Sequence, residues 1–415
     1  MRYKILLSTV CIFSFITTLS QTNQNTAFAV VNNSNGKLAW MNIQEIDLST
    51  GQVTRQIFDK EKTKFVMIDG STKKPIKMEQ VDKTPKRIAE YEHPTATMVA
   101  AAAFDKRHNR LFFTPMRFAE LRWIDLSDKN ASVKVYCLSN QLLSEALARN
   151  EGSQVTRMTI AADGNGYALT NDGYFVRFTT GKKPVVTQLG QLKDDPSNDK
   201  KSIRNRESWG GDMIADAFGN LYVIAANTTV YRININDRVA TYIGTLQGLP
   251  QSFTTNGAAV DNNGDVIVSN AYTKVAYYKV NIETLEAKKL EIPNEVFASS
   301  DLASGNLAFQ NAANNLRAPM NRANVTMLNK NISFYPNPVT YNYFKLSFQN
   351  NEKGRYDIQL VDLDGKIVFQ KYVNLSMRNQ TENILVDARL SRGMYIIKIL
   401  NGAQKQVSSG NILLQ

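Results

Sequence analysis

Residues 212–234 read DMIADAFGNLYVIAANTTVYRIN and contain the pattern that decides the fold. An apolar strand over residues 213–215 ends at Asp216, a short turn with Gly219 and Asn220 follows, and a second apolar strand begins at once. Asp and Asn side chains hydrogen-bond to the backbone two residues further on, and Gly adopts a positive φ without strain. The segment therefore predicts two antiparallel strands joined by a tight turn.

The same strand–turn–strand pattern recurs along the middle of the chain, with two more strands after each turn. The Asp or Asn of the other copies is Asn32, Asp105, Asp163, Asp261 or Asp301. Repeated units of four strands are typical of β-propeller blades. We therefore predict an all-β fold with a β-propeller of about six blades over residues 21–310. Five blades result if residues 299–309 pair with residues 28–60.

The stretch 212–234 also resembles blades of the NHL and related propeller families. Those blades carry an apolar strand, an Asp, a Gly-Asn turn and a second strand, and the resemblance covers roughly residues 28–310. It implies a fold and no particular activity, because propellers with this pattern perform unrelated functions.

The beginning of the chain is typical of an export signal. Arg2 and Lys4 precede an apolar stretch over residues 5–19, and small or polar residues follow it. This pattern predicts a signal peptide over residues 1–20. No later apolar run is long enough to span a bilayer, so we expect no transmembrane segment in the mature chain. The mature chain would keep Cys137 as its sole thiol, which we expect to be buried and structural.

The chain of 415 residues has a formal net charge of +12, spread without a block of like charges. A nucleic-acid-binding arm would show such a block, and a protein exported from the cell seldom meets nucleic acid, so we expect no nucleic-acid partner. A diffuse positive field suits contact with an acidic polysaccharide or a negatively charged outer surface, and it equally serves solubility alone.

The last part of the chain has a different composition. Residues 311–331 are rich in Asn and Ala and are expected to form a linker. Residues 332–415 contain about seven short strand-like runs, with hairpin turns at Asp364-Gly365 and Asn401-Gly402. This spacing predicts a small Ig-like β-sandwich.

This segment strongly resembles the type A sorting domain of the type IX secretion system of Bacteroidetes. The matching motifs are Tyr335-Pro336-Asn337-Pro338, residues 360–368, Val386-Asp387 and residues 393–399. The resemblance implies export across both membranes and an interaction of residues 332–415 with the type IX secretion machinery. It also implies a secreted or cell-surface protein at the outer face of the outer membrane.

A candidate site lies in the loop SIRNRESWGGD, residues 202–212, which combines charge, an aromatic residue and two glycines. In a propeller this loop shares one end with the turns after the second strands, and an Arg–Trp pair can bind a sugar or a carboxylate. The candidate ligand-binding residues are Arg204, Arg206, Glu207, Trp209, Asp212, Asn171, Asn227, Asn256 and Asn270. The open alternative is that Asp212 and the glycines only shape the entry to the next blade.

The sequence offers little for catalysis or metal binding. His93 and His108 are expected at opposite ends of one blade, and the chain has no His-Glu-x-x-His motif, Cys pair or Gly-x-Ser-x-Gly motif. We predict no catalytic residue, metal or cofactor.

Three functions fit these patterns. The favoured one is a non-enzymatic module whose propeller face binds a glycan or protein partner. The second is a propeller-type hydrolase or lactonase, which needs acidic residues such as Asp212, Asp216, Asp261 and Asp301 to converge on the central channel. The third is a structural adhesin.

Overall fold

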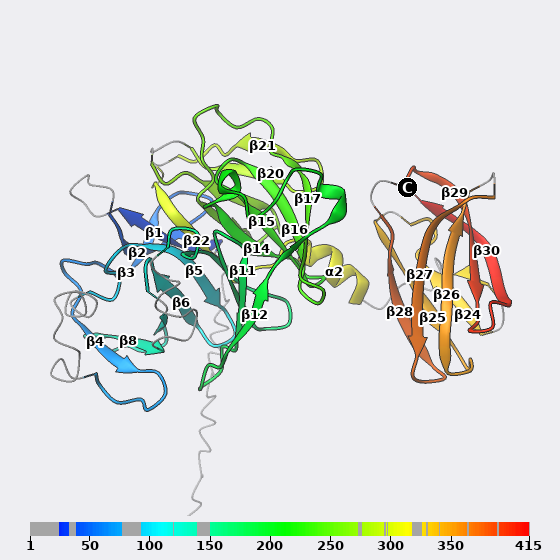
Figure 1. Ribbon diagram of the computed structural model, residues 1–415, viewed down its shortest axis with the longest axis horizontal. Helices are drawn as coiled ribbons and strands as arrows, with labels where there is room; N and C mark the ends of the chain where they lie inside the picture. The colour runs from blue at the N-terminus through cyan, green and yellow to red at the C-terminus, as the bar shows by residue number, and fades with distance from the viewer. Residues whose placement is uncertain are drawn as a thin grey trace, which may run out of the picture. The chain divides into compact units, whose positions relative to one another are not determined.

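The computed structural model forms two compact units, residues 1–310 and 311–415 (Figure 1). It describes residues 25–32, 39–76, 93–118, 120–138, 150–272, 276–293, 296, 298–317, 326–328, 331–339, 341–362, 365–387 and 390–414. The predicted signal peptide, residues 1–20, lies outside the described residues. Nearly all regular structure is β-strand, which confirms the predicted all-β class.

The first unit is a β-propeller. Its described strands form five sheets, and the innermost strands of these sheets pack side by side in a closed ring. In ring order these inner strands are β22 (Ser299–Ala303), β5 (Val99–Asp105), β9 (Val155–Ile160), β14 (Asp212–Ala215) and β18 (Gly257–Val260). Sheets arranged around such a ring are the blades of a propeller.

Each blade continues outward through antiparallel strands. Blade 1 adds β1 (Thr26–Asn32), β2 (Trp40–Asp47) and β3 (Val53–Phe58). Blade 2 adds β6 (Arg110–Pro115), β7 (Leu121–Asp125), β8 (Val133–Leu138) and a parallel outer strand, β4 (Phe65–Asp69). Blade 3 adds β10 (Gly166–Thr170), β11 (Tyr174–Phe178) and β12 (Val186–Gln191). Blade 4 adds β15 (Asn220–Ile224), β16 (Thr229–Asn234), β17 (Val239–Thr245) and the parallel β13 (Lys193–Asp194). Blade 5 adds β19 (Val266–Ser269), β20 (Tyr278–Asn281) and β21 (Glu286–Lys289).

The blade number differs from the six expected, because the last repeat does not begin a blade of its own. Its strand β22 pairs antiparallel with β1, with Phe28 opposite Ala303 and Val30 opposite Asp301. The repeat thus supplies the inner strand of blade 1 and closes the ring. This is the five-blade arrangement that the sequence left open.

The predicted turn chemistry is present at the hairpins between first and second strands. Asp216 accepts hydrogen bonds through Oδ1 from the backbone N–H groups of Phe218 and Asn220, both at 2.8 Å. Gly219 between them has a φ of +90°. Asp261 binds the N–H groups of Asn263 and Asp265 in the same way. In these two repeats the Asp side chain therefore fixes the predicted reversal.

Because neighbouring strands alternate in direction, the two ends of the propeller are built from different connections. Turns after the first and third strands of blades 2 to 5 lie at one end, here called the turn end. Turns after the second strands, together with the connections between blades, lie at the opposite end, here called the loop end.

The second unit is a β-sandwich of two four-stranded sheets around one apolar core. One sheet contains β23 (Thr326–Met327), β24 (Ile332–Tyr335), β25 (Tyr343–Phe348) and β28 (Gln380–Leu385). The other contains β27 (Ile367–Leu375), β26 (Gly354–Val361), β29 (Gly393–Leu400) and β30 (Gln406–Leu414). Both proline peptide bonds in the Tyr335–Pro338 motif are cis.

The segment expected as a linker, residues 311–331, contains regular structure. Helix α2 (Gln310–Arg317) begins at its edge, and β23 joins the sandwich. The Tyr343 hydroxyl donates a hydrogen bond to the carbonyl of Ala312 at 2.9 Å, which ties the helix to strand β25. No helix among the described residues is both long and apolar enough to cross a membrane.

Candidate functional site

The predicted loop is part of the connection from blade 3 to blade 4, residues 192–211, at the loop end. Two short 3-10 helices shape this connection, η3 (Pro196–Asn198) and η4 (Arg206–Ser208). Asn198 is buried and donates to the carbonyl of Ala240 at 2.8 Å, while Ile203 is fully buried. The connection is thus anchored to blade 4 at several points.

Trp209 and Arg206 form a cation–π pair on this loop. The guanidinium carbon of Arg206 lies 5.7 Å from the centroid of the Trp209 ring. The indole Nε1 donates to the carbonyl of Arg204 at 3.2 Å, and the ring packs so closely on Gly152 that a Cβ there would lie 3.2 Å from it. Trp209 is therefore held in place, and it supports an Arg206 side chain that is 80% exposed.

The two remaining charged candidates on the loop are also exposed. Arg204 pairs with Asp194 at 3.1 Å, with 44% of its side chain exposed. Arg206 lies 3.7 Å from Glu151, and Glu207 is an exposed residue of η4. The structure thus brings Arg204, Arg206, Glu207 and Trp209 together as one exposed surface, here called the 204–209 surface.

The four candidate asparagines have their side chains committed to the backbone. The Oδ1 of Asn171 accepts from the N–H of Gly210 at 2.8 Å. Asn227 accepts in the same way from Thr229, Asn256 from Ala271 and Asn270 from Tyr272. Asn227 and Asn270 serve their own turns, Asn256 joins a more distant backbone group, and Asn171 contacts the 202–212 loop.

Asp212 lies inside the propeller and away from the 204–209 surface. Its carboxylate is fully buried and accepts from the N–H groups of Met213 (2.7 Å), Ala258 (2.6 Å) and Leu302 (3.4 Å). It therefore joins the inner strands β14, β18 and β22. Burial raises the pKa of Asp212 well above its usual value, despite these hydrogen bonds.

Asp301 on β22 is the second buried acid of the ring centre. Burial raises its pKa well above the usual range, and the negative charge of Asp212 raises it further. Two acids do therefore meet near the axis, as a hydrolase would require. Asp216 and Asp261 do not join them, because they hold the hairpin turns of blades 4 and 5.

Sequence reasoning missed Arg157, which positions the candidate loop. This fully buried side chain on β9 donates to the carbonyls of Ser208, Gly210 (2.9 Å) and Thr170 (3.3 Å). Burial lowers the pKa of Arg157 to about 10. The one available signal was an arginine within the otherwise apolar or small-residue strand VTRMTI.

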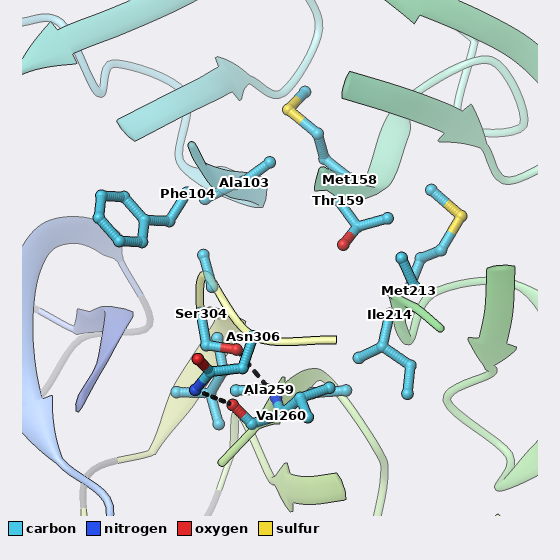
Figure 2. A pocket seen from close by; sticks show the side chains of 15 residues that line it. Ala103, Phe104, Met158, Thr159, Met213, Ile214, Ala259, Val260, Ser304 and Asn306 are labelled. Atoms are coloured by element: carbon cyan, nitrogen blue, oxygen red, sulfur yellow. Dashed lines mark hydrogen bonds between the residues drawn. The ribbon is translucent and has the colours of Figure 1, made fainter. Parts of the chain in front are cut away.

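A small pocket lies between the inner strands, near their turn-end termini (Figure 2). Small and apolar side chains of the five inner strands line it, among them Ala103, Met158, Ile214 and Ala259. The cavity volume is about 10 Å³, close to the least that holds one water molecule. Ser304 Oγ accepts from the N–H of Val260 at 2.9 Å beside it. This part of the axis has no room for a substrate.

His108 and Cys137 both make structural contacts. His108 pairs through Nδ1 with Asp105 at 2.6 Å in the turn after β5, so it serves that turn. Cys137 is buried and its thiol donates to Glu120 at 3.2 Å. Across the part of the chain that the structure describes, no three His, Cys, Asp or Glu side chains are placed to hold a metal ion.

Comparison with protein families identifies the second unit. Residues 333–412 match the secretion system C-terminal sorting domain. The predicted resemblance of this segment is thereby confirmed, and its sorting domain indicates export by the type IX secretion system. It is exported through that system as a secreted or cell-surface protein.

Solved structures with similar folds include three bacterial proteins. One is a protein of unknown function from Bacteroides thetaiotaomicron, with 15% identity over 49% of this chain and 53% of that chain and a TM-score of 0.36. A putative 6-phosphogluconolactonase from Bacteroides uniformis has 12% identity over 68% and 71% of the two chains and a TM-score of 0.34. PorZ, an essential surface component of the type IX secretion system of Porphyromonas gingivalis, has 10% identity over 94% and 51% and a TM-score of 0.32.

The alignments span about half the length of the first and third of these structures. At these identities and TM-scores they carry no argument about activity. No curated protein gives a significant match to the sequence.

Proposed function

We propose that the propeller is a non-enzymatic binding module, displayed at the outer face of the outer membrane, whose 204–209 surface contacts a glycan or a protein partner. One observation carries this proposal: Arg206 is exposed and stacked on a Trp209 ring that is itself fixed by its neighbours. A side chain already held in one place loses less conformational entropy when a partner binds.

The charges of this surface remain available to a partner. The Arg206–Glu151 contact of 3.7 Å joins side chains that are 80% and 66% exposed, and such pairs contribute little to stability in water. The guanidinium can therefore exchange Glu151 for a carboxylate or hydroxyl of a ligand. Arg and Trp are also the residue types most enriched among the residues that dominate binding energy.

The hydrolase alternative fits the geometry less well. Asp212 and Asp301 are fully buried, and the oxygens of Asp212 already accept three backbone N–H groups. An N–H group pointed at a carboxylate oxygen occupies the lone pair that a metal ion or a substrate proton would use. Asp212 thus serves the fold, and the exposed 204–209 surface is the better candidate for function.

A binding experiment tests this proposal. The full chain is screened on a glycan array and against outer-membrane extracts by crosslinking, and binding of the ligand found is then measured for Arg206→Ala and Trp209→Ala. We expect each variant to lose about tenfold or more in affinity, which corresponds to about 1.4 kcal/mol.

The chain offers a matched control for these variants. Arg355 lies over the ring of Tyr372 in the sorting domain, 3.8 Å from its centroid, and forms the same type of cation–π pair. Arg355→Ala should leave the affinity unchanged. Wild-type affinity in Arg206→Ala and Trp209→Ala would instead support the structural adhesin and refute this binding surface.

A further inference from the structure

Positive side chains gather where blades 2 and 3 meet at the turn end of the propeller. Arg110, at the start of β6, reaches across to blade 3 and donates through Nη1 to the carbonyls of Thr180 (3.0 Å) and Gly181 (2.6 Å). These bonds fix the turn after β11 against blade 2. The same turn carries the exposed side chains of Lys182 and Lys183.

Lys73, in the turn after the outer strand β4 of blade 2, adds a third cation to Arg110 and Lys183. Its ammonium lies over the rings of Trp123 and Tyr136, at 4.9 and 5.1 Å from their centroids. Burial lowers the pKa of Lys73 and the positive charges of Arg110 and Lys183 lower it further, while the negative charge of Asp69 raises it. These like charges are thus close enough to repel one another.

The turn after β5 completes the group. His108 Nδ1 lies 3.4 Å from the Thr180 hydroxyl, which places the preceding residue, the exposed Arg107, beside the same turn of blade 3. We call Lys73, Arg107, Arg110, Lys182 and Lys183 the basic patch.

The nearby acids neutralise the basic patch only in part. Asp105 is buried and bound to His108, and Asp69 accepts from the N–H groups of its own turn. Asp125 lies 3.6 Å from Arg110. Among the described residues, no carboxylate forms an ion pair with Arg107, Lys182 or Lys183. A bound polyanion would relieve the repulsion that remains.

We propose that the basic patch binds an acidic polysaccharide, at the end of the propeller opposite the 204–209 surface. The cations are distributed over three separate turns and do not converge on one point, which suits a chain of regularly spaced anions better than a single phosphate or carboxylate. Export by the type IX system takes the propeller out of the cell, where charged polysaccharides are abundant binding partners.

The test compares two polymers with the same backbone, dextran sulfate and unsulfated dextran, as probes of the full chain at about 0.15 M salt. The test variant is the double substitution Lys182→Glu with Lys183→Glu. Its control is Lys288→Glu with Lys289→Glu, a second adjacent pair of exposed lysines, on β21 of blade 5, which changes the net charge equally. We expect dextran sulfate to bind the wild type and the control, and the test variant to lose about tenfold or more in affinity.

Several results would overturn the proposal. Equal losses in both double variants would show that only net charge matters, and binding of unsulfated dextran would show that the anions are irrelevant. Binding to vesicles with anionic headgroups without binding to dextran sulfate would assign the patch to a membrane. Should the test variant fail to fold, Lys182→Gln with Lys183→Gln, matched by Lys288→Gln with Lys289→Gln, gives the same comparison. Trp209→Ala should leave dextran sulfate binding intact, which separates this inference from the proposed function.

Discussion

At the scale of single residues, recurrence in the sequence did not distinguish structure from function. Asn227 and Asn270 follow the second strands of two blades, and both side chains accept backbone N–H groups of their own turns. A repeated Asn is expected equally of a turn and of a ligand ring, so spacing alone could not decide. Trp209 and Arg206 were identifiable as candidates because they are not part of the repeated pattern, and no turn in their loop requires these residue types.

The role of Asp212 also could not be predicted from local sequence. The sequence placed Asp212 in the candidate site, because it is the last residue of the 202–212 loop. In the structure its carboxylate joins three inner strands that are distant in sequence, by bonds to Ala258 and Leu302. Contacts between residues this far apart depend on ring closure, which no local pattern encodes.

Asp301 gives a prediction for stability against pH. Its pKa is raised in the folded chain, so folding binds a proton that the unfolded chain, with a pKa near 3.8, has released. The stability that Asp301 contributes is complete below that unfolded pKa and is lost as pH rises through the folded pKa. Asn has nearly the same size and shape as Asp and stays neutral at every pH. The unfolding free energy of Asp301→Asn should therefore increase relative to that of the wild type as pH rises.

Urea unfolding of both proteins at about pH 5 and about pH 8 measures this difference. Asp212→Asn is the contrasting variant, because its amide would meet N–H donors where the carboxylate accepts them. We expect it to destabilise the fold by about 1–3 kcal/mol at about pH 5. Because the pKa of Asp212 is also raised, this loss should be smaller at about pH 8. A difference between Asp301→Asn and the wild type that does not vary with pH would contradict the account.

At the scale of elements, local chemistry was the part that sequence predicted best. The Asp216 turn and the strands on either side follow directly from residues within one short stretch. Residues 202–212 were expected as a loop. The two 3-10 helices of the connection over residues 192–211 and the burial of Ile203 were not expected. The basic patch was also missed, because a bond such as Arg110 to Gly181 spans 71 residues and gathers charges that are dispersed in sequence.

Gly211 gives a prediction at this scale, since it ends the 202–211 loop and begins blade 4. Its φ is +86°, and a Cβ there would lie 2.1 Å from the carbonyl oxygen of Ile224. Gly211→Ala combines a strained backbone with a clash against a central strand, so we expect a loss of about 3 kcal/mol or more in unfolding free energy.

Gly164→Ala is the matched control for this change. Gly164 has a similar φ of +79°, but a Cβ there would meet nothing within 4 Å. Its substitution should therefore cost only the backbone strain, about 1 kcal/mol. Urea unfolding compares the two variants, and equal losses would show that the clash at Gly211 is relieved by movement of the loop.

At the scale of the whole molecule, the two units were predicted from different kinds of sequence pattern. The sorting domain was recognisable from ordered motifs, such as Tyr335-Pro336-Asn337-Pro338, and residues 333–412 match its family. The propeller was recognisable as a repeat, but its blade number depended on the pairing of β22 with β1, which joins residues far apart in sequence. The sequence of the second unit therefore identified the sorting domain. The proposed binding surfaces were found from the geometry of the first unit.

The central claim is that residues 333–412 direct export. The most direct test compares the location of the propeller, inside or outside the outer membrane, in chains with and without these residues. The protein is expressed in a host with an active type IX system, and a protease is added to intact cells. The account predicts that the full chain is found outside, at the cell surface or in the medium, and that the shortened chain stays inside, protected from the protease with a folded propeller. A shortened chain that still reaches the outside would contradict the claim that this domain directs export.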